Sequence, residues 1–319
     1  MKTLRTLALF LTSAIALPTF AADQPTPAEV AAKGMPPTIA PGAQVVLLSD
    51  AGEGSFTEGT TCAANGDVYF TDQNHNRIYK WDVTAKKVSV FLEPSGRANG
   101  QYFDAKGNLV ACADEMDQLW SIAPDGTHTV LVANFNGKYM NGPNDVWIRP
   151  DGGMYLTDPF YLRAWWDHKL QPQPACDVYY LTPDHTALWL VAKDFAKPNG
   201  IVGTPDGKTL YVSDIDGGRT WGYDIQPEGT LTQKRLVCNF GSDGMSIDEQ
   251  GNLYLTVPGA NNGVTVVDSK TGQEIGYIPV PQHPANLAFG GKDKKTLYIC
   301  AGTGFYSIDM NVKGLNQSK

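Results

Sequence analysis

The sequence predicts an all-β protein, a six-bladed β-propeller, and three observations lead to this prediction. An oxygen-bearing residue recurs eight positions before the Gly, or its equivalent, of a turn that leads into a strand. The recurrences are 41, 45, 55, 44 and 43 residues apart, a period typical of propeller blades. Beyond roughly the first 40 residues, no run combines helical periodicity with an absence of Gly and Pro. The recurring residues are Glu58, Asn99, Asn144, Asn199, Asp243 and Asn286, and the turn positions are Gly66, Gly107, Gly152, Gly207, Gly251 and Lys294.

Each repeat contains segments in which polar and apolar residues alternate. Asp67-Val-Tyr-Phe-Thr and Lys208-Thr-Leu-Tyr-Val-Ser are rich in aromatic and β-branched residues and follow Asn-Gly or Asp-Gly turns. Ahead of the first repeat, Gln44-Val-Val-Leu-Leu-Ser has the composition of a strand. We expect it to complete the last blade, which would close the ring without a free sheet edge. A single domain over residues 42–319 therefore accounts for all six repeats.

The N-terminus has the features of an export signal. Lys2 and Arg5 precede an apolar run, and Thr19-Phe-Ala supplies small residues before a cleavage position. We interpret residues 1–22 as a signal peptide and residues 23–41 as a flexible leader, so the protein is expected in the periplasm or the medium. The apolar run is too short to span a bilayer, and no later run approaches the ~20 apolar residues that a span requires. No association with a membrane is expected.

Composition and missing motifs argue against several functions. A net charge of −8 disfavours nucleic acid as a partner. The motifs GxGxxG, GxxxxGK(S/T) and GxSxG are absent, which argues against nucleotide cofactors and a nucleophile-elbow hydrolase. No spacing of Cys and His suggests zinc. Four of the five Cys are expected to be buried thiols, whereas Cys176 lies in a Pro-rich loop and could pair. We expect a monomer or a small homo-oligomer.

The six recurring residues are expected to meet at one place. The inner strand of every propeller blade lies beside the central axis, so equivalent positions converge in the channel. Two carboxylates and four amides, without sulfur or imidazole, suit a hard cation, and Ca²⁺ is the first choice over Mg²⁺ and Zn²⁺. Alternatively, Asn-Gly and Asp-Gly pairs simply mark repeated turns. That alternative fits Asn65-Gly66 and Asp206-Gly207, but Glu58, Asn144 and Asn286 keep the offset and belong to no such pair.

Several stretches of the chain are similar to one family of proteins. They are Pro143-Asn-Asp-Val with Tyr155-Leu-Thr-Asp-Pro-Phe-Tyr, Pro198-Asn-Gly-Ile with Ser213-Asp, Ser242-Asp-Gly-Met with Asn252-Leu-Tyr, and Pro284-Ala-Asn-Leu-Ala-Phe-Gly-Gly. Over nearly all residues after 45, the chain resembles the SMP-30/gluconolactonase family of six-bladed propellers, which includes calcium-dependent lactonases. Arg97-Ala-Asn-Gly followed by Gly107-Asn-Leu-Val-Ala-Cys is similar to the bacterial gluconolactonase branch. This similarity favours a sugar lactone as the substrate.

The resemblance also implies roles for individual residues. Glu58, Asn144, Asn199 and Asp243 would be the metal ligands, and Asn99 would touch the substrate. Residues 59–61 depart from the family's usual Gly-Pro-aromatic sequence, which we expect to reshape the pocket mouth more than to weaken metal binding.

Two further residues are candidates for substrate contacts. His283 stands three residues before Asn286, close enough to the expected channel mouth to act as a proton shuttle or to contact the substrate. Asn286 is expected to face the substrate or to line the channel.

The mechanism suggested by these roles is hydrolysis of a lactone. Ca²⁺ would polarise the carbonyl oxygen, and Asp243 would either activate water as a general base or attack directly as a nucleophile. Glu58 would hold the metal charge in place.

Two other features of the repeats carry expectations. The insertion between Pro159 and Pro174 contains Tyr161, Trp165 and Trp166, which we expect to form a lid over the entrance or to pack a long loop. A second set of recurring carboxylates is expected to make structural hydrogen bonds to neighbouring turns. These carboxylates are Asp72, Asp114, Asp158 and Asp214.

Two alternatives to a calcium-dependent lactonase remain open. One is an esterase or organophosphate hydrolase of the same fold. The other is a propeller that binds a small-molecule ligand without any chemistry, because a fold alone does not decide a function. The two carboxylates among the recurring residues argue for catalysis.

Overall fold

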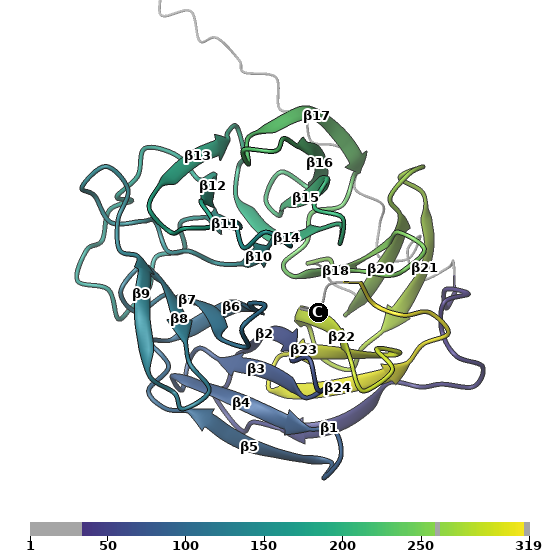
Figure 1. Cartoon of the computed structure of the whole chain (residues 1–319). Coiled ribbons are helices and arrows are strands. Elements are labelled where there is room, and N and C mark those ends of the chain that lie inside the picture. Colours follow the sequence, from purple (N-terminus) through teal and green to yellow (C-terminus); the bar gives the residue numbers. More distant parts are fainter. Residues whose placement is uncertain (1–33, 259–261, 316–319) are drawn as a thin grey trace, which may run out of the picture.

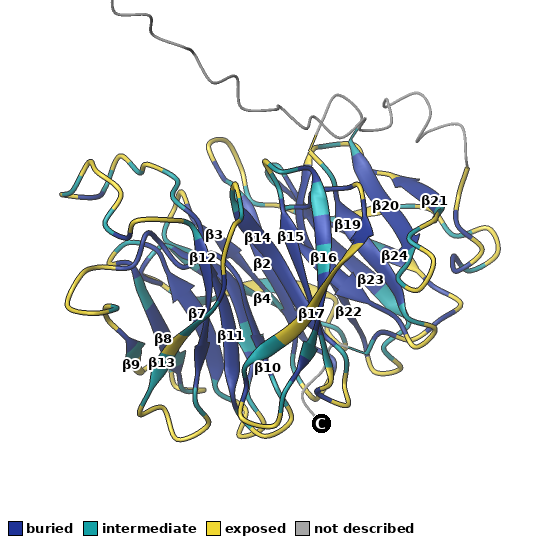
Figure 2. Cartoon of the chain, turned by 90° about the horizontal axis from the view of Figure 1, so that it is seen from above, coloured by how far each residue is buried: buried dark blue, intermediate teal, exposed yellow. Residues whose placement is uncertain are grey.

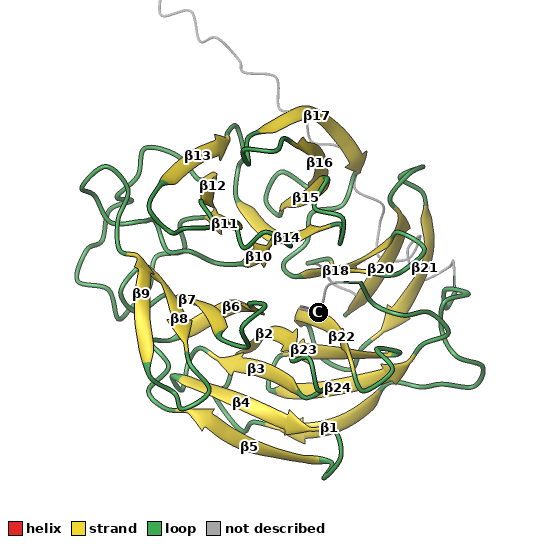
Figure 3. Cartoon of the chain, in the orientation of Figure 1, coloured by secondary structure: helices red, strands yellow, loops and turns green. Residues whose placement is uncertain are grey.

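The computed structural model describes residues 34–258 and 262–315, and these residues form a six-bladed β-propeller (Figure 1). Each blade is a four-stranded antiparallel sheet, and strands and loops without any helix make up the described part of the chain (Figure 3). The predicted fold is confirmed. The same residues contain no helix of the length and apolar character that a membrane span requires.

The blades have equivalent strands at four distances from the central axis, with the inner strands facing the centre of the ring in Figure 1. The inner strands are β2 (Thr57–Cys62), β6 (Ala98–Phe103), β10 (Val146–Ile148), β14 (Pro198–Gly203), β18 (Met245–Ile247) and β22 (Pro284–Gly290). The second strands are β3 (Val68–Asp72), β7 (Leu109–Ala113), β11 (Met154–Asp158), β15 (Thr209–Asp214), β19 (Asn252–Thr256) and β23 (Thr296–Ala301). The third strands are β4 (Arg77–Asp82), β8 (Gln118–Ile122), β12 (Asp177–Leu181), β16 (Arg219–Ile225), β20 (Gly263–Asp268) and β24 (Gly304–Asp309). The outer strands are β5 (Lys87–Leu92), β9 (His128–Val132), β13 (Leu188–Ala192), β17 (Leu231–Cys238), β21 (Glu274–Pro279) and β1 (Val46–Asp50).

The two ends of the propeller meet in the sixth blade. Strand β1 pairs antiparallel with β24, with Val46 opposite Ser307 and Asp50 opposite Gly304. The strand expected around Val46 therefore completes the last blade, as predicted. This pairing joins the first strand of the ring to the last and covers the sheet edge that β24 would otherwise expose.

The residues just before β1 differ from the expected flexible leader. Ile39 forms a β-bridge with Met310, and Ala40 N donates to Asp309 O at 3.1 Å. Thr38 and Ile39 are buried. The Ile39 side chain packs in the apolar cluster that contains Met310. Residues 34–41 therefore pack on the fifth and sixth blades, since Tyr277 N of β21 donates to Gly34 O at 2.9 Å. The signal peptide (1–22) and the rest of the leader (23–33) lie outside the described residues.

The turn at offset eight has the same conformation in all six blades. The residue at this position has a positive φ each time, from 58° at Lys294 to 94° at Gly66 and Gly152. Its N–H donates to the carbonyl three residues earlier, as in Gly66 N to Ala63 O at 2.9 Å and Lys294 N to Gly291 O at 3.2 Å. Glycine adopts this left-handed backbone without steric cost, which explains its recurrence in five of the six turns.

The hydrophobic core lies between neighbouring blades, where the strands are buried (Figure 2). At the seam between the first and last blades, Phe70 of β3 stacks on Phe305 of β24 with ring centroids 4.2 Å apart, and Tyr298 stacks on the same ring at 5.6 Å. All five cysteines are free thiols, and Cys176 is the one that is not fully buried. The pairing considered for Cys176 is therefore absent.

The recurring carboxylates after the second strands are structural, as predicted for three of them. Asp72 Oδ1 accepts from Phe56 N at 3.1 Å, Asp158 Oδ2 from Asn141 N at 2.9 Å, and Asp214 Oδ1 from Lys197 N at 2.7 Å. Each carboxylate thus accepts a backbone hydrogen bond from the loop that leads into its own blade and holds that loop in place. The carboxylate of Asp114 instead binds side chains from the first and third blades.

Replacing Phe305 with Ala should destabilise the closed ring. Phe305 is fully buried at the seam, and removing a buried phenyl ring typically costs about 3 to 5 kcal/mol of unfolding free energy. Urea unfolding of the variant measures the loss. Val90→Ala on outer strand β5, where Val90 is 49% exposed, serves as the control and should cost less than about 1 kcal/mol. Equal losses in the two variants would contradict the importance of the seam.

Candidate active site

The six recurring residues lie at one end of the central channel, at the starts of the inner strands. Asn144 and Asp243 stand two residues before β10 and β18, and the other four lie within inner strands. Five of the six are buried, whereas Asp243 keeps part of its surface open to solvent. We call these residues the axial ring. The ring residues are Glu58, Asn99, Asn144, Asn199, Asp243 and Asn286.

Glycine after four of the ring residues lets the inner strands approach one another. A Cβ on Gly59, Gly100, Gly200 or Gly244 would collide with the inner-strand backbone of the next blade. Gly100 N donates to Asn144 O, and Gly244 N donates to Ala285 O, both at 2.7 Å. These Glu-Gly, Asn-Gly and Asp-Gly pairs are therefore close contacts between blades. The turn alternative is correct for Asn65-Gly66 and Asp206-Gly207 but not for the ring.

Two carboxylates of the ring are neighbours. The carboxyl groups of Glu58 and Asp243 lie close enough for the charge of Asp243 to raise the pKa of Glu58, and a shared proton or a bound cation would relieve the repulsion between two such charges. Asn199 opposes the rise in the pKa of Asp243, and Asn286 opposes the rise in the pKa of Glu58. The Glu58 carboxylate also accepts the N–H of Gly59.

Burial dominates the electrostatics of this pair. Loss of hydration raises the pKa of Glu58 well above its usual range, and the charges of Asp243 and Asp145 raise it further. Burial raises the pKa of Asp243 to about 6, although hydrogen bonds from Asn199 and Glu58 and the charge of Arg163 oppose the rise. A divalent cation would remove this penalty by neutralising both carboxylates at once.

Asp145 is a third acidic residue at the ring that sequence reasoning missed. Burial raises the pKa of its carboxyl to about 7, and its Oδ1 accepts from Val146 N at 2.9 Å. A sequence signal existed, because Asn144 is followed by Asp where four other ring residues are followed by Gly. The additional carboxylate increases the negative potential felt by a cation on the axis.

Several buried polar atoms on the axis have no hydrogen-bond partner among the residues that the structure describes. They are Asn99 Oδ1, Thr60 Oγ1 and both amide atoms of Gln101. A cavity of about 20 Å³ lies beside Thr60 and Gln101 and is also lined by Asn286, and this volume suffices for one water molecule. Unpaired buried polar atoms are rare in folded proteins, so their clustering here indicates a place for a polar ligand.

The two ring amides expected near the substrate, Asn99 and Asn286, differ in their hydrogen bonding. Asn286 Oδ1 accepts from Thr60 N at 3.2 Å and from Leu287 N at 2.8 Å, so its carbonyl oxygen is already used inside the protein. Asn99 Oδ1 is unpaired and remains available to a ligand. The structure thus favours the channel-lining role that was considered for Asn286.

The ring has the donor types that a hard cation requires. Carboxylate and amide oxygens are the usual ligands of Ca²⁺, and both kinds converge here. Within residues 34–258 and 262–315, no group of three His, Cys, Asp or Glu side chains is placed to hold a metal ion. A cation at the ring therefore depends on the amides as well as on Glu58 and Asp243, and the residues fit a hard divalent ion.

The insertion between β11 and β12 contacts the ring through Tyr161. Tyr161 Oη accepts a hydrogen bond from Asn199 Nδ2 at 3.0 Å, and Arg163 contributes a favourable charge to Asp243. Trp166 is buried, and its Nε1 donates to Asp114 O at 2.5 Å. Trp166 therefore packs the loop, as one of the two expectations has it, and Tyr161 contacts the ring, while a lid over the entrance stays a prediction. Sequence periodicity gave no signal for Arg163.

His283 lies on the surface just before β22. It is exposed, and its backbone oxygen accepts from Gly302 N at 3.0 Å. Partial loss of hydration lowers the pKa of its imidazole, so the neutral ring predominates at neutral pH. A contact between His283 and the substrate stays a prediction.

A larger hollow of about 380 Å³ lies at the opposite ends of the inner strands, around Phe103, Arg149 and Gly203. Its carboxylates are already used by turns, since Asp104 Oδ1 accepts from Lys106 N at 2.8 Å and Asp151 Oδ1 accepts from Gly153 N at 3.0 Å. The axial ring is smaller but has the converging polar groups that a reaction requires.

Comparisons with known proteins agree with this geometry. The sequence profile of the SMP-30/Gluconolactonase/LRE-like region matches residues 56–303. A gluconolactonase of Zymomonas mobilis is 32% identical over 289 residues, which cover 80% of this chain and 78% of that protein. The lactonase drp35 of Staphylococcus aureus is 24% identical over 301 residues, which cover 82% and 85% of the two chains.

Solved structures show the same likeness. A putative gluconolactonase superimposes with a TM-score of 0.79 at 30% identity, covering 87% of this chain and 96% of its own. A gluconolactonase from Xanthomonas campestris has a TM-score of 0.77 at 28% identity, with coverages of 86% and 95%. A calcium-binding regucalcin from Agrobacterium tumefaciens has a TM-score of 0.69 at 18% identity, with coverages of 84% and 94%, and this likeness concerns the fold alone.

The raised pKa values of the ring carboxyls predict how stability changes with pH in the presence of a chelator. Because the folded protein holds these protons to a higher pH than the unfolded chain does, stability should be greatest below about pH 4 for this contribution and should fall as pH rises through about 6. We expect Asp243 to contribute about 1 to 3 kcal/mol to the fall. Urea unfolding at pH 5 and pH 8 measures it.

Asp243→Asn provides the matched control for this pH dependence, because an amide does not titrate. The variant should lose less stability than the wild type between the two pH values. An identical fall in both proteins would contradict the burial of a titrating Asp243.

Proposed function

Since the chain belongs to the SMP-30/gluconolactonase/LRE-like family, we propose that it is a lactonase that hydrolyses a sugar lactone, or a related lactone, to the hydroxy acid. The observation that carries this proposal is the convergence of the Glu58 and Asp243 carboxyls, whose charges act on each other, within a ring of amides. Relatives named gluconolactonase and lactonase support the reaction type.

We propose Ca²⁺ as the cofactor, with other divalent cations as possible substitutes. Glu58, Asn144, Asn199 and Asp243 would hold it through two carboxylates and two amide oxygens, a donor set that suits this ion. When bound, the cation would supply Lewis-acid polarisation of the lactone carbonyl. Asn99 Oδ1, which has no hydrogen-bond partner among the described residues, and the two carboxyls whose charges act on each other support the presence of a ligand on the axis.

The protein's own residues would then divide the remaining tasks. Asp243 is the ring carboxyl with surface open to solvent, so it can take a proton from water or attack the carbonyl carbon directly. Tyr161 accepts a hydrogen bond from Asn199 and thereby fixes the orientation of that amide. Glu58, which is buried, would supply a fixed negative charge to the cation. Asn99 and His283 would contact the substrate.

Replacing Asp243 with Asn should reduce turnover of δ-gluconolactone by about 10²- to 10⁴-fold, the range typical of a lost general base. The folded state should survive, because the amide has nearly the same shape. Acid release at saturating substrate with added Ca²⁺ measures the effect. Asp206→Asn alters an exposed turn carboxylate and should keep the wild-type rate. An undiminished rate in Asp243→Asn would disprove its role.

A substrate panel separates this function from the alternatives. Acid release from δ-gluconolactone, an aryl ester and paraoxon is followed with and without EDTA. A lactonase would act mainly on the lactone and lose activity with EDTA, whereas preference for the ester or paraoxon would identify the second hydrolase class. Binding without turnover would identify a ligand-binding propeller.

We also propose that the protein is exported through the signal peptide at residues 1–22, to the periplasm or the medium. The basic and apolar sequence of that segment supports the proposal. The mature protein should begin near Asp23, and mass spectrometry of the intact protein from its native host checks this. A mass that includes the first 22 residues would contradict export by cleavage.

A further inference from the structure

Tyr161 is the residue through which the insertion between β11 and β12 contacts the axial ring. Its Oη accepts a hydrogen bond from Asn199 Nδ2 at 3.0 Å. Asn199 is buried, with 2% of its surface exposed. Water therefore cannot easily replace the tyrosine as an acceptor for this N–H, and an N–H that is buried without an acceptor costs free energy. This hydrogen bond ties a ring amide to the insertion.

Two cations from different segments hold the Tyr161 ring. Lys197 Nζ lies 4.5 Å from the ring centroid, and the Arg163 guanidinium lies 5.4 Å from it. A cation near an aromatic face attracts the ring electrostatically. Lys197 immediately precedes β14, the strand that carries Asn199. The tyrosine is therefore attached to this segment through both its hydroxyl and its ring.

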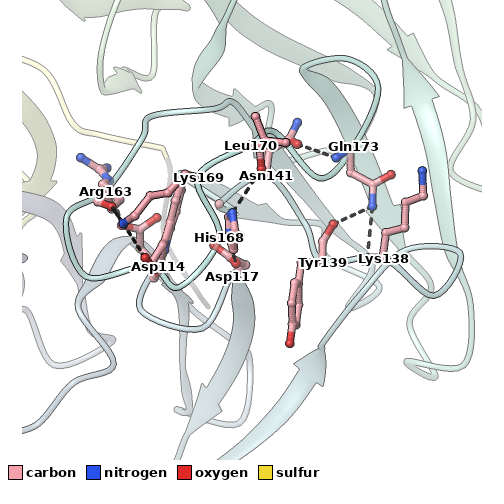
Figure 4. Close-up of polar contacts among 12 residues, drawn as sticks. Asp114, Asp117, Lys138, Tyr139, Asn141, Arg163, His168, Lys169, Leu170 and Gln173 are labelled. Carbon is pink, nitrogen blue, oxygen red and sulfur yellow. Dashed lines mark hydrogen bonds and ion pairs between the residues drawn. The ribbon is translucent and has the colours of Figure 1, made fainter.

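Arg163 is fixed in turn by the second blade. Its Nε lies 2.9 Å from Asp114 Oδ2, and Asp114 is 2% exposed. Farther along the insertion, His168 Nε2 lies 2.7 Å from Asp117 Oδ2. Figure 4 shows both pairs, which join the insertion to the loop between β7 and β8. These contacts hold the insertion, and with it the tyrosine, in one position relative to the ring.

The hydrogen bond to Tyr161 decides which atom of the Asn199 amide can serve a cation. A cation needs the carbonyl oxygen Oδ1, whereas Nδ2 can only donate hydrogen bonds. When Oδ1 turns toward the axis, Nδ2 needs an acceptor elsewhere, and Tyr161 Oη provides it. Groups that hydrogen-bond a metal ligand in this way orient the ligand and tune the affinity of the site.

We propose that Tyr161 is a positioning residue for the cation of the axial ring: by accepting the Asn199 N–H, it keeps the amide oxygen available to the ion. The insertion thus sets how tightly the ring binds a cation, although it contributes no ligand of its own. This inference rests on the proposed lactonase function and its proposed Ca²⁺ cofactor. It gives a loop that lies outside the repeats a part in the metal site.

Tyr161→Phe tests the proposal, because it keeps the ring between Lys197 and Arg163 and removes only the hydroxyl. Ca²⁺ binding to chelator-treated protein is measured by isothermal titration calorimetry. We expect the Kd to rise about 10-fold, at the lower end of the effects typical of residues that orient metal ligands. Hydrolysis of δ-gluconolactone should recover when Ca²⁺ is raised enough to saturate the weakened site.

Tyr139→Phe is the matched control. Tyr139 is 58% exposed, and its ring stacks on His168 of the insertion with ring centroids 5.9 Å apart. The substitution removes the same hydroxyl group from a tyrosine that packs on the insertion at the protein surface. This variant should keep the wild-type Kd for Ca²⁺.

A second background separates positioning from a general loosening of the insertion. Asn199→Asp replaces the amide with a carboxylate, which has no N–H that needs an acceptor. Adding Tyr161→Phe to Asn199→Asp should therefore change the Kd by less than about 3-fold, because the interaction between the two side chains has already been removed. If Tyr161 only held the insertion in place, the loss would be equal in both backgrounds.

The outcomes distinguish this inference from the function on which it rests. An unchanged Kd in Tyr161→Phe, an equal loss in the two backgrounds, or turnover that stays low at saturating Ca²⁺ would overturn the positioning role while leaving the lactonase intact. A wild-type protein that hydrolyses δ-gluconolactone without binding Ca²⁺ would overturn the cofactor and this inference but not the function. A wild-type protein that does neither would overturn all three.

Discussion

The convergence of the Glu58 and Asp243 carboxyls at one end of the central channel is the constraint on which the site depends. Two like charges removed from water are costly unless a proton or a cation lies between them. The two carboxyls come together because glycines after four ring residues let the inner strands approach one another, where a Cβ would collide with the backbone of the next blade. The hydrophobic seams between blades, such as the Phe70–Phe305 stack, hold those strands in place.

The ring is asymmetric in charge although its backbone repeats. Glu58, Asp243 and the nearby Asp145 lie among four amides, and the insertion adds Tyr161 and Arg163 from one side. Because the blades repeat, equivalent side chains converge at the ring. The groups suited to catalysis occur where individual blades depart from the repeat. A site of this kind can retain a cation at the floor while a single insertion shapes the wall that a substrate meets.

Periodicity made the fold and the ring predictable from the sequence. The offset of eight identified a turn position with a left-handed backbone, which Lys294 also adopts with a φ of 58°. The same offset located the ring residues at the starts of the inner strands. Asp145 was missed although the pair Asn144-Asp145 departs from the Gly that follows four other ring residues. Arg163 and the packing of Ile39 were missed because each depends on contacts between segments far apart in the sequence. A repeat reveals equivalent positions and is silent about residues that occur once.

The most direct test of the central claim is the amount of divalent cation bound to the purified protein. Isothermal titration of chelator-treated protein with Ca²⁺ should give one binding site per chain, and Asp243→Asn should weaken it strongly because one of the two ring carboxylates is lost. Absence of binding at millimolar Ca²⁺, or unchanged binding in the variant, would contradict the account.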